Sequence, residues 1–425
     1  MRGRRVQIEP AEQRFNANER QPTQFEYSNV ADRHVAKSSS TVTHSRRKTR
    51  VCLIGLNNLS VLAPHYDKTG AAGEPVQHTL LARALIKRGY EVSMITADHG
   101  QADGEVCEGI RVFAAYSLNA GLPVLRFFHP RWSGLWAAMK RANADVYYIS
   151  CAGAIVGQVG LFCRMHGKPY VFRIASDADC APDTLVLKKW QWRDSRLYAY
   201  GLRHASTVLA QSEHQRKLLR KNYAVESTIA SLLVDAPEQL RPFSQRDIDV
   251  LWVNNLRALK RPDVFLRLAD DLPSLRFHVV GGPVPGDQAF YDATKQQMQR
   301  RANLTFHGPV PYGAVNEFYA RARVLVNVSD IEGFPNSYLQ AWVRGTPVAA
   351  YFDPDAMIAR HRLGTAAKAY EELLGSVRML ASDQDAWERA SARSRDFMRE
   401  RFGEDTTVDP YVSALEIRAT NRVTV

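Results

Sequence analysis

The stretch Val324-Leu-Val-Asn-Val-Ser-Asp-Ile-Glu-Gly-Phe-Pro-Asn-Ser-Tyr-Leu-Gln-Ala-Trp-Val-Arg-Gly-Thr-Pro-Val348 decides the fold of this 425-residue chain. Its apolar beginning predicts a strand buried on both faces. A tight loop, a short helix and a second strand that starts after Pro347 follow. A strand, a helix and a strand in this order make a parallel βαβ unit.

The same alternation of apolar runs and helical patterns extends outward in both directions. The predicted strands are 51–56, 91–96, 145–150, 169–175 and 206–211, then 248–253, 275–280, 303–307, 323–328 and 347–350. Helical patterns of roughly 10–15 residues between strands indicate parallel, doubly wound sheets. The sequence therefore predicts an α/β protein of two Rossmann-like domains, with ligands bound in a central cleft beyond the carboxyl ends of the strands.

The composition changes along the chain suggest five segments. We expect a disordered basic tail, an N-terminal domain, a linker that contains prolines, a C-terminal domain and a helical segment that crosses back to the N-terminal domain. Their predicted ranges are 1–48, 49–236, 237–247, 248–402 and 403–425.

The charge and hydropathy of the chain limit the classes of partner and the cellular locations to be expected. The formal charge is +12, but residues 1–50 hold 11 Lys and Arg against 5 Asp and Glu, so half of the excess lies in the tail. No nucleic-acid recognition motif accompanies the charge, and we expect no nucleic-acid partner. No apolar run approaches the ~20 residues of a membrane span, and the five cysteines form no CxxC. No apolar run follows the first, basic residues, so we expect no signal peptide. We therefore expect a cytoplasmic location, either free in the cytoplasm or at the inner face of the membrane.

The loop and helix of the opening stretch carry the candidate chemistry. Walker A, GxGxxG, HExxH and GxSxG motifs are absent, and the scattered acidic triplets do not predict an essential metal. Ser337 is predicted to cap the helix, with Gln340 completing a capping box. The backbone N–H groups at such a helix start suit an anionic oxygen such as phosphate. Glu332, just before them, is well placed to hold sugar hydroxyls.

These residues carry a family resemblance. Glu332-Gly-Phe-Pro-Asn-Ser337, followed by Ala341 and Gly345-Thr-Pro-Val348, resembles the donor-binding motif of the family 4 retaining glycosyltransferases, which have the GT-B fold. Other short stretches resemble further motifs of that family, each less specifically. Together they extend the resemblance from about Val51 to Arg401. These stretches are 73–77, 88–92, 252–262, 277–283 and 307–310.

The resemblance implies an enzyme that moves a sugar from a nucleotide diphosphate-sugar to a glycan, lipid-linked or small-molecule acceptor, without metal or cofactor, in cell-surface polysaccharide or glycoconjugate synthesis. It implies Glu332 as the catalytic residue. It places donor contacts at Arg257, Lys260, Gly333, Phe334, Pro335, Asn336, Ser337 and Gln340. Gly73, Asp177 and Asp179 are candidates for the acceptor side, although either aspartate could equally cap a loop or helix.

Three positions depart from the family pattern. Gln340 stands where the family has a second glutamate, Asn255 where it has an arginine, and Ala175 where many members have a histidine. A glutamine can still accept a hydrogen bond from a ribose, more weakly than a carboxylate. Two alternatives therefore stay open: a catalytically degenerate GT-B protein that acts as a binding or partner subunit, and a nucleotide-sugar epimerase of the same architecture.

An aromatic, basic segment lies in the N-terminal half. Phe127, Phe128, Trp132 and Trp136 occur among arginines and lysines, which is typical of a surface that contacts a membrane. The spacing of the two tryptophans also fits one packed helix face, the interpretation that we favour.

Overall fold

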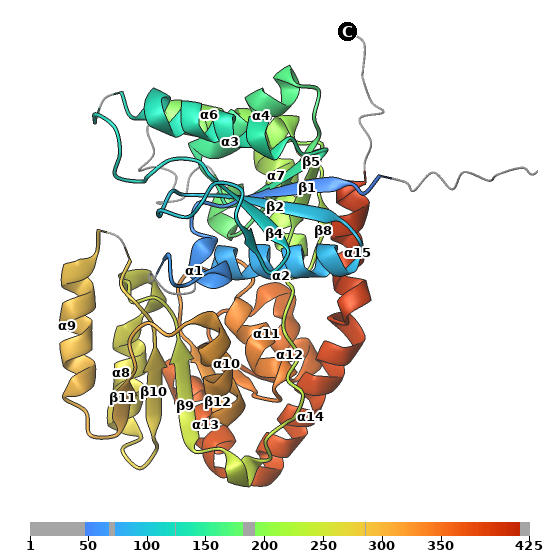
Figure 1. Cartoon of the computed structure of the whole chain (residues 1–425). Coiled ribbons are helices and arrows are strands. Elements are labelled where there is room, and N and C mark those ends of the chain that lie inside the picture. Colours follow the sequence, from blue (N-terminus) through green and yellow to red (C-terminus); the bar gives the residue numbers. More distant parts are fainter. Residues whose placement is uncertain (1–46, 68–72, 124, 182–191, 285, 417–425) are drawn as a thin grey trace, which may run out of the picture. The chain divides into compact units, whose positions relative to one another are not determined.

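The computed structural model describes residues 47–67, 73–123, 125–181, 192–284 and 286–416 (Figure 1). Almost all of the predicted basic tail, and residues 417–425 of the predicted terminal segment, lie outside the described residues. In the described part of the chain, no helix is long and apolar enough to cross a membrane.

The first sheet has eight strands in the order β3-β4-β2-β1-β5-β6-β7-β8, parallel except for the β3–β4 pair. The strands are β1 (Arg50–Ile54), β2 (Glu91–Thr96), β3 (Val106–Cys107), β4 (Ile110–Ala114), β5 (Val146–Ser150), β6 (Tyr170–Arg173), β7 (Thr207–Ala210) and β8 (Thr228–Ile229). The helices of this half are α1 (Leu59–Leu62), α2 (Gly73–Lys87), the kinked segment η1 (Phe127–Trp132), α3 (Ser133–Ala142), α4 (Ala154–Met165), η2 (Asp177–Cys180), α6 (Trp192–His204) and α7 (Glu213–Tyr223).

The second sheet has six parallel strands in the order β11-β10-β9-β12-β13-β14. The strands are β9 (Ile248–Val253), β10 (Phe277–Val280), β11 (Leu304–Phe306), β12 (Ala322–Asn327), β13 (Val348–Ala350) and β14 (Gly364–Ala366). The helices are η3 (Phe243–Gln245), η4 (Ala258–Lys260), α8 (Pro262–Asp271), α9 (Gln288–Gln299), α10 (Tyr312–Arg321), α11 (Asn336–Val343), η5 (Pro354–Ala356), α12 (Met357–His361), α13 (Tyr370–Ser382), α14 (Gln384–Arg401) and α15 (Glu404–Leu415).

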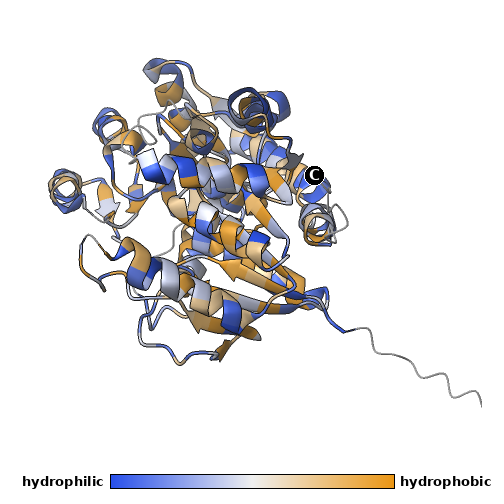
Figure 2. Ribbon diagram, turned by 90° about the horizontal axis from the view of Figure 1, so that it is seen from above, coloured by the Kyte–Doolittle hydropathy of each residue, from blue (hydrophilic) through white to orange (hydrophobic). Residues whose placement is uncertain are grey.

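Both sheets are covered on their two faces, which explains why their strands are almost uninterrupted apolar runs. In β1, Cys52 and Ile54 belong to a core shared with α3, α4 and α6, whereas Val51 and Leu53 pack with α1, α2 and α15. This is the alternation that a pleated strand imposes. Figure 2 shows the strands as predominantly apolar ribbons among helices of mixed polarity.

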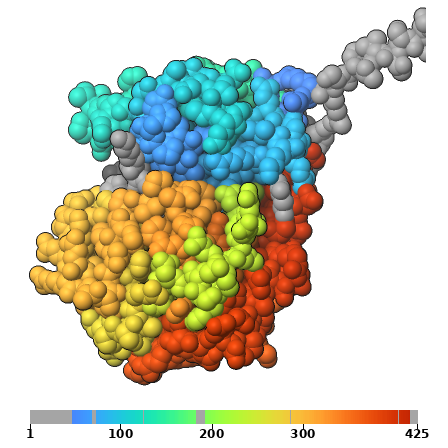
Figure 3. All heavy atoms as spheres, turned by 60° about the horizontal axis from the view of Figure 1, so that its bottom comes forward, coloured from blue at the N-terminus to red at the C-terminus, as the bar shows by residue number. Residues whose placement is uncertain are grey.

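The C-terminal helix α15 packs against the N-terminal half of the chain. Arg88, at the end of α2, forms ion pairs with Asp405 and Asp409, and the hydroxyl of Tyr411 donates to the carbonyl of Ser231. In the space-filling view the last described residues, in red, lie beside the blue and cyan residues of the N-terminal half (Figure 3).

The predicted fold class is confirmed. Each predicted strand is present, with its ends within two residues of the prediction. Sequence reasoning missed β3, β4, β8 and β14, which lie at or next to the sheet edges. Three of them have only two or three residues, whereas β4 has five. Because β9 and β12 are parallel neighbours, their carboxyl ends meet at one edge of the second sheet, where the candidate site is found.

Candidate functional site

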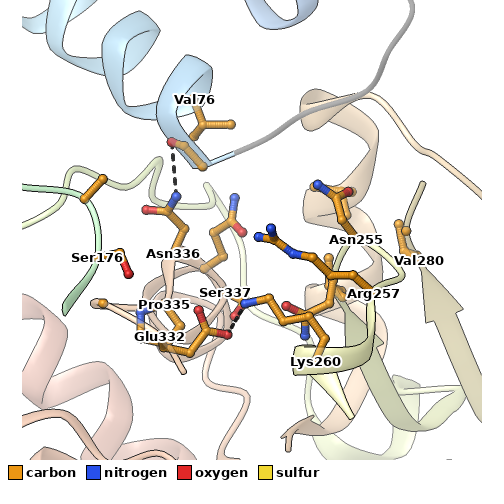
Figure 4. Close-up of a pocket in the computed structure, with 18 of the residues that line it drawn as sticks. Val76, Ser176, Asn255, Arg257, Lys260, Val280, Glu332, Pro335, Asn336 and Ser337 are labelled. Carbon is orange, nitrogen blue, oxygen red and sulfur yellow. Dashed lines mark hydrogen bonds and ion pairs between the residues drawn. The ribbon is translucent and has the colours of Figure 1, made fainter. Parts of the chain in front are cut away.

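A cavity of about 460 Å³ lies beyond the carboxyl ends of β6, β9, β10 and β12 (Figure 4). Its lining from the N-terminal half is Gly73, Val76, Ala175, Ser176, Ala178 and Asp179. Its lining from the second half includes all the residues predicted to bind the donor: Arg257, Lys260, Gly333, Phe334, Pro335, Asn336, Ser337 and Gln340, together with Glu332. The structure therefore gathers the predicted donor side around one cavity.

The acidic group of the loop after β12 is paired with a lysine. Lys260 Nζ lies 2.5 Å from Glu332 Oε1, and Asn327 Nδ2 donates to the same oxygen at 3.3 Å. The two charged side chains are only 9% and 13% exposed. Burial lowers the pKa of Lys260, and the nearby carboxylate of Glu332 opposes that shift. The pair is thus a nearly enclosed ammonium and carboxylate that face the cavity together.

Arg257 adds a second cation from the loop after β9. Its half-buried guanidinium extends into the cavity alongside the Lys260 ammonium, and Asn255 lies on the same wall (Figure 4). The Nε group of Arg257 has no hydrogen-bond partner in the described structure. Arg261, in contrast, forms ion pairs with two exposed carboxylates outside this cavity. Two cations therefore converge where an anionic ligand would enter.

The helix that follows the loop begins differently from the prediction. Helix α11 starts at Asn336, its N-cap is Pro335, and no side chain caps it. The predicted capping box of Ser337 and Gln340 is therefore wrong, because the extended backbone of Pro335 starts the helix earlier and places Ser337 inside the first turn. Ser337 still lines the cavity.

The loop is fixed by contacts with the N-terminal half. Phe334 N–H donates to Gln211 Oε1 at 2.8 Å, and Gln211 Nε2 donates to the carbonyl of Ile174. A Cβ atom on Gly333 would lie only 2.5 Å from the carbonyl oxygen of Ala175, so this close approach requires glycine. The N–H of Phe334 is consequently used inside the protein, although the sequence suggested that it would face the ligand.

Asn336 makes a second connection of this kind. Its amide group accepts from Gln77 Nε2 at 3.0 Å and donates to the carbonyl of Gly73 at 3.2 Å. Gln77 also bonds both backbone groups of Leu233. These contacts place the start of α2 against the start of α11.

Gln340 and Tyr312 add two neutral polar groups to the cavity lining. Both side chains are buried and line the cavity. Burial raises the pKa of Tyr312 to about 12, so its phenol stays protonated and can donate a hydrogen bond. A neutral amide and a phenol together suit ligand hydroxyls.

The three residues proposed for the acceptor side differ in position. Gly73 and Asp179 line the cavity, whereas Asp177 is directed to Gln215, whose Nε2 donates to it at 3.0 Å. Asp179 accepts from the backbone N–H groups of Ala175 and Ser176, and burial raises its pKa to about 6. Asp179 therefore caps the loop after β6, the alternative that the sequence had left open.

Sequence reasoning did not select two polar residues beside the cavity. Gln211 directly follows β7. The only feature of the sequence that could have marked it as a site residue is its position at the carboxyl end of a predicted strand. Glu74 lies in the first turn of α2, where Ser150 Oγ donates to it at 3.4 Å and burial raises its pKa to about 7. Among the residues that the structure describes, no group of three or more His, Cys, Asp or Glu side chains could hold a metal ion.

Comparisons with known proteins agree with this geometry. The model of the glycosyl transferase 4-like domain matches residues 73–233, and that of the glycosyl transferases group 1 matches residues 238–395. A D-inositol 3-phosphate glycosyltransferase of Mycolicibacterium paratuberculosis is 33% identical over 104 residues, 24% of this chain and 24% of that protein. The match thus spans about a quarter of the length of this curated relative.

Two solved structures share the fold at low sequence identity. Sucrose-phosphate synthase from Thermosynechococcus elongatus superposes with a TM-score of 0.69 at 15% identity, covering 86% of this chain and 98% of that one. HepE of Anabaena, in complex with UDP and glucose, gives a TM-score of 0.66 at 14% identity, covering 86% and 99%. The chain thus has a glycosyl transferase 4-like domain followed by a glycosyl transferases group 1 domain, and its two α/β sheets are parallel except for the β3–β4 pair. It belongs to the family 4 glycosyltransferases of GT-B fold.

Proposed function

We propose that this chain is a retaining glycosyltransferase that moves a sugar from a nucleotide diphosphate-sugar to a hydroxyl of a glycan, lipid-linked or small-molecule acceptor. One observation carries the proposal: Arg257, Lys260 and Glu332, from loops after two neighbouring strands, face one cavity at the start of α11. Two cations beside a carboxylate suit a diphosphate linked to a sugar.

In the proposed complex, the diphosphate lies between Arg257 and Lys260. The pair with Glu332 has to loosen, so that the ammonium turns to a phosphate oxygen and the carboxylate accepts from sugar hydroxyls. Gln340 and the phenol of Tyr312 are available for the ribose. Fixed cations of this kind stabilise the negative charge that develops on a leaving diphosphate.

The transfer step conserves all atoms. The bond between the anomeric carbon and the phosphate oxygen breaks, and the electron pair stays with the nucleoside diphosphate. The acceptor oxygen attacks the same face of the sugar, and its proton passes to a phosphate oxygen of the departing group. The Gln211–Phe334 and Gln77–Asn336 contacts bring the two halves together around the cavity, which supports the exclusion of water from this step.

We also propose a cytoplasmic site of action, at or near the inner face of a membrane, in polysaccharide or glycoconjugate synthesis. All five cysteines are free thiols, a state that fits a reducing compartment.

The test is a turnover assay with a panel of nucleotide diphosphate-sugars, each with and without a membrane and glycan extract. UDP-glucose is the first donor to try, because the HepE structure contains UDP and glucose. We expect release of nucleoside diphosphate that depends on acceptor, and a product with the donor's anomeric configuration. Binding without turnover for every donor would favour the non-catalytic alternative, and conversion of the donor sugar without acceptor would favour an epimerase.

A further inference from the structure

Large apolar side chains are exposed on the N-terminal half, in and around the kinked segment η1. Leu122, Leu125, Phe128 and Trp192 are 69%, 56%, 62% and 69% exposed, and we call these four residues the η1 patch. Backbone hydrogen bonds coil the segment that holds the first three of these residues, because Arg126 N–H donates to the carbonyl of Leu122 and Phe128 N–H donates to that of Leu125. Soluble surfaces rarely carry such a group without a partner.

Trp192, from the start of α6, joins the patch through its neighbour in sequence. The guanidinium of Arg193 lies 3.6 Å from the ring centre of Phe127, and the ring of Phe127 contacts that of Phe128 at 5.1 Å. The start of α6 therefore lies against η1, and the exposed ring of Trp192 belongs to a residue next to that contact, some 65 residues away in the sequence.

A row of aromatic rings connects the patch to the protein core. Phe127 contacts Trp132 at 5.6 Å, Trp132 contacts Trp136 at 6.0 Å, and Trp136 contacts the buried Phe162 at 5.8 Å. The nitrogen of the Trp136 indole donates to the carbonyl of Gln158. The two tryptophans thus pack inward, as we had favoured, but they support exposed side chains rather than closing that surface.

The charges around the patch are mainly positive, and the carboxylate of Asp194, near Trp192, is paired with Arg193. Residues 109–144 contain five Lys and Arg and no Asp or Glu. Arg126 and Arg196 form no ion pair with another described residue, and the guanidinium of Arg196 lies over the ring of Trp192 at 3.9 Å. When the face of a guanidinium stacks on an aromatic ring, its N–H groups remain free to bind an anion.

We infer that the η1 patch docks the protein on an anionic lipid bilayer. Apolar and aromatic side chains surrounded by cations suit the boundary between acyl chains and phosphate headgroups, where apolar burial and charge attraction add. A segment of 36 residues without a carboxylate matches a negative surface better than the mixed charges of a typical protein partner. Docking through this face goes beyond the proposed transfer reaction, and it favours an acceptor that is held in the membrane.

The experiment measures co-sedimentation of the full-length chain with phosphatidylcholine vesicles that contain or lack phosphatidylglycerol, in the absence of donor. We expect binding to the anionic vesicles only. The double variant Phe128→Ser, Trp192→Ser should weaken that binding at least tenfold while it keeps every charge, including those of the basic tail. The matched control Met379→Ser, at an exposed methionine of α13, should bind like the parent chain.

A second variant separates the two contributions. Arg126→Gln with Arg196→Gln should lower the affinity for anionic vesicles several-fold and make it less sensitive to salt. Unchanged melting temperatures and unchanged nucleoside diphosphate binding would show that the variants fold. The inference is overturned if the parent chain ignores anionic vesicles, or if the Ser double variant binds them equally well. Neither result bears on the transfer reaction, which is assayed separately.

Discussion

At the scale of single residues, the site is governed by the enclosed pair of Lys260 and Glu332. The sequence places Glu332 in a loop, where its carboxylate is well placed to hold sugar hydroxyls. The structure places it 2.5 Å from a buried ammonium, and breaking one side of such a pair leaves the other charge without compensation. The same residue thus links proposed catalysis to stability.

Glu332→Gln should therefore abolish sugar transfer and also destabilise the fold by about 1.5–3 kcal/mol, the range for hydrogen bonds to charged groups. Turnover and urea unfolding measure the two effects. Adding Lys260→Met should recover part of the lost stability, because the lone ammonium is then removed. Equal unfolding midpoints for the parent and Glu332→Gln would show that the pair contributes nothing to stability.

Gln340→Glu tests the proposed ribose contact. The carboxylate is a stronger acceptor than the amide, and the backbone at this position is unchanged, with Arg344 Nη1 donating to the backbone carbonyl of residue 340 at 3.1 Å. We expect the dissociation constant of the nucleoside diphosphate to fall or stay level at fixed salt concentration. An affinity loss beyond tenfold in calorimetry would remove Gln340 from the ribose site.

At the scale of elements, strands were predictable and the ends of helices were not. Runs such as Ile248–Val253 are apolar because both faces of a parallel sheet are covered, and that pattern is written in consecutive residues. The start of α11 depends on the extended backbone of Pro335, which the sequence leaves open. Local pattern thus fixes what is buried, whereas a cap depends on a few dihedral angles.

Helix α2 provides a prediction for pH. The pKa of Glu74 is raised from 4.5 to about 7 by burial, so the folded state binds more protons than the unfolded state between these values. Stability then falls as pH rises from about 4.5 to 7. Glu74→Gln should remove this fall and raise the melting temperature at pH 8 relative to the parent. Parallel melting profiles from pH 4.5 to 8 in both proteins would contradict the assignment.

At the scale of the whole molecule, contacts far apart in the sequence shape the cavity. Gln211 and Phe334 are 123 positions apart, and Gln77 and Asn336 are 259 apart. The donor-side residues could be predicted because they lie in one or two local motifs. The residues that hold the loop could not, because their partners are set only when both sheets are built.

Gln211→Met tests one of these long-range contacts. It leaves Phe334 N–H and the carbonyl of Ile174 without their side-chain partner, and an unsatisfied buried group costs about 1–3 kcal/mol. We expect a loss of stability in this range by urea unfolding, together with a higher donor KM. Gln211→Glu keeps an acceptor for Phe334 N–H and should lose less. If both variants unfold like the parent, the contact is not formed in solution.

The central claim is that Lys260 and Arg257 hold a nucleoside diphosphate in this cavity, and calorimetric titration of UDP, GDP and ADP tests it most directly. We predict that one nucleotide binds, and that Lys260→Ala weakens it by about 1.5–3 kcal/mol, the range for a charge-assisted hydrogen bond. Arg261→Ala, which removes a cation paired outside the cavity, should leave the affinity unchanged. Equal affinities for the parent and Lys260→Ala, or no binding of any of the three nucleotides, would contradict the account.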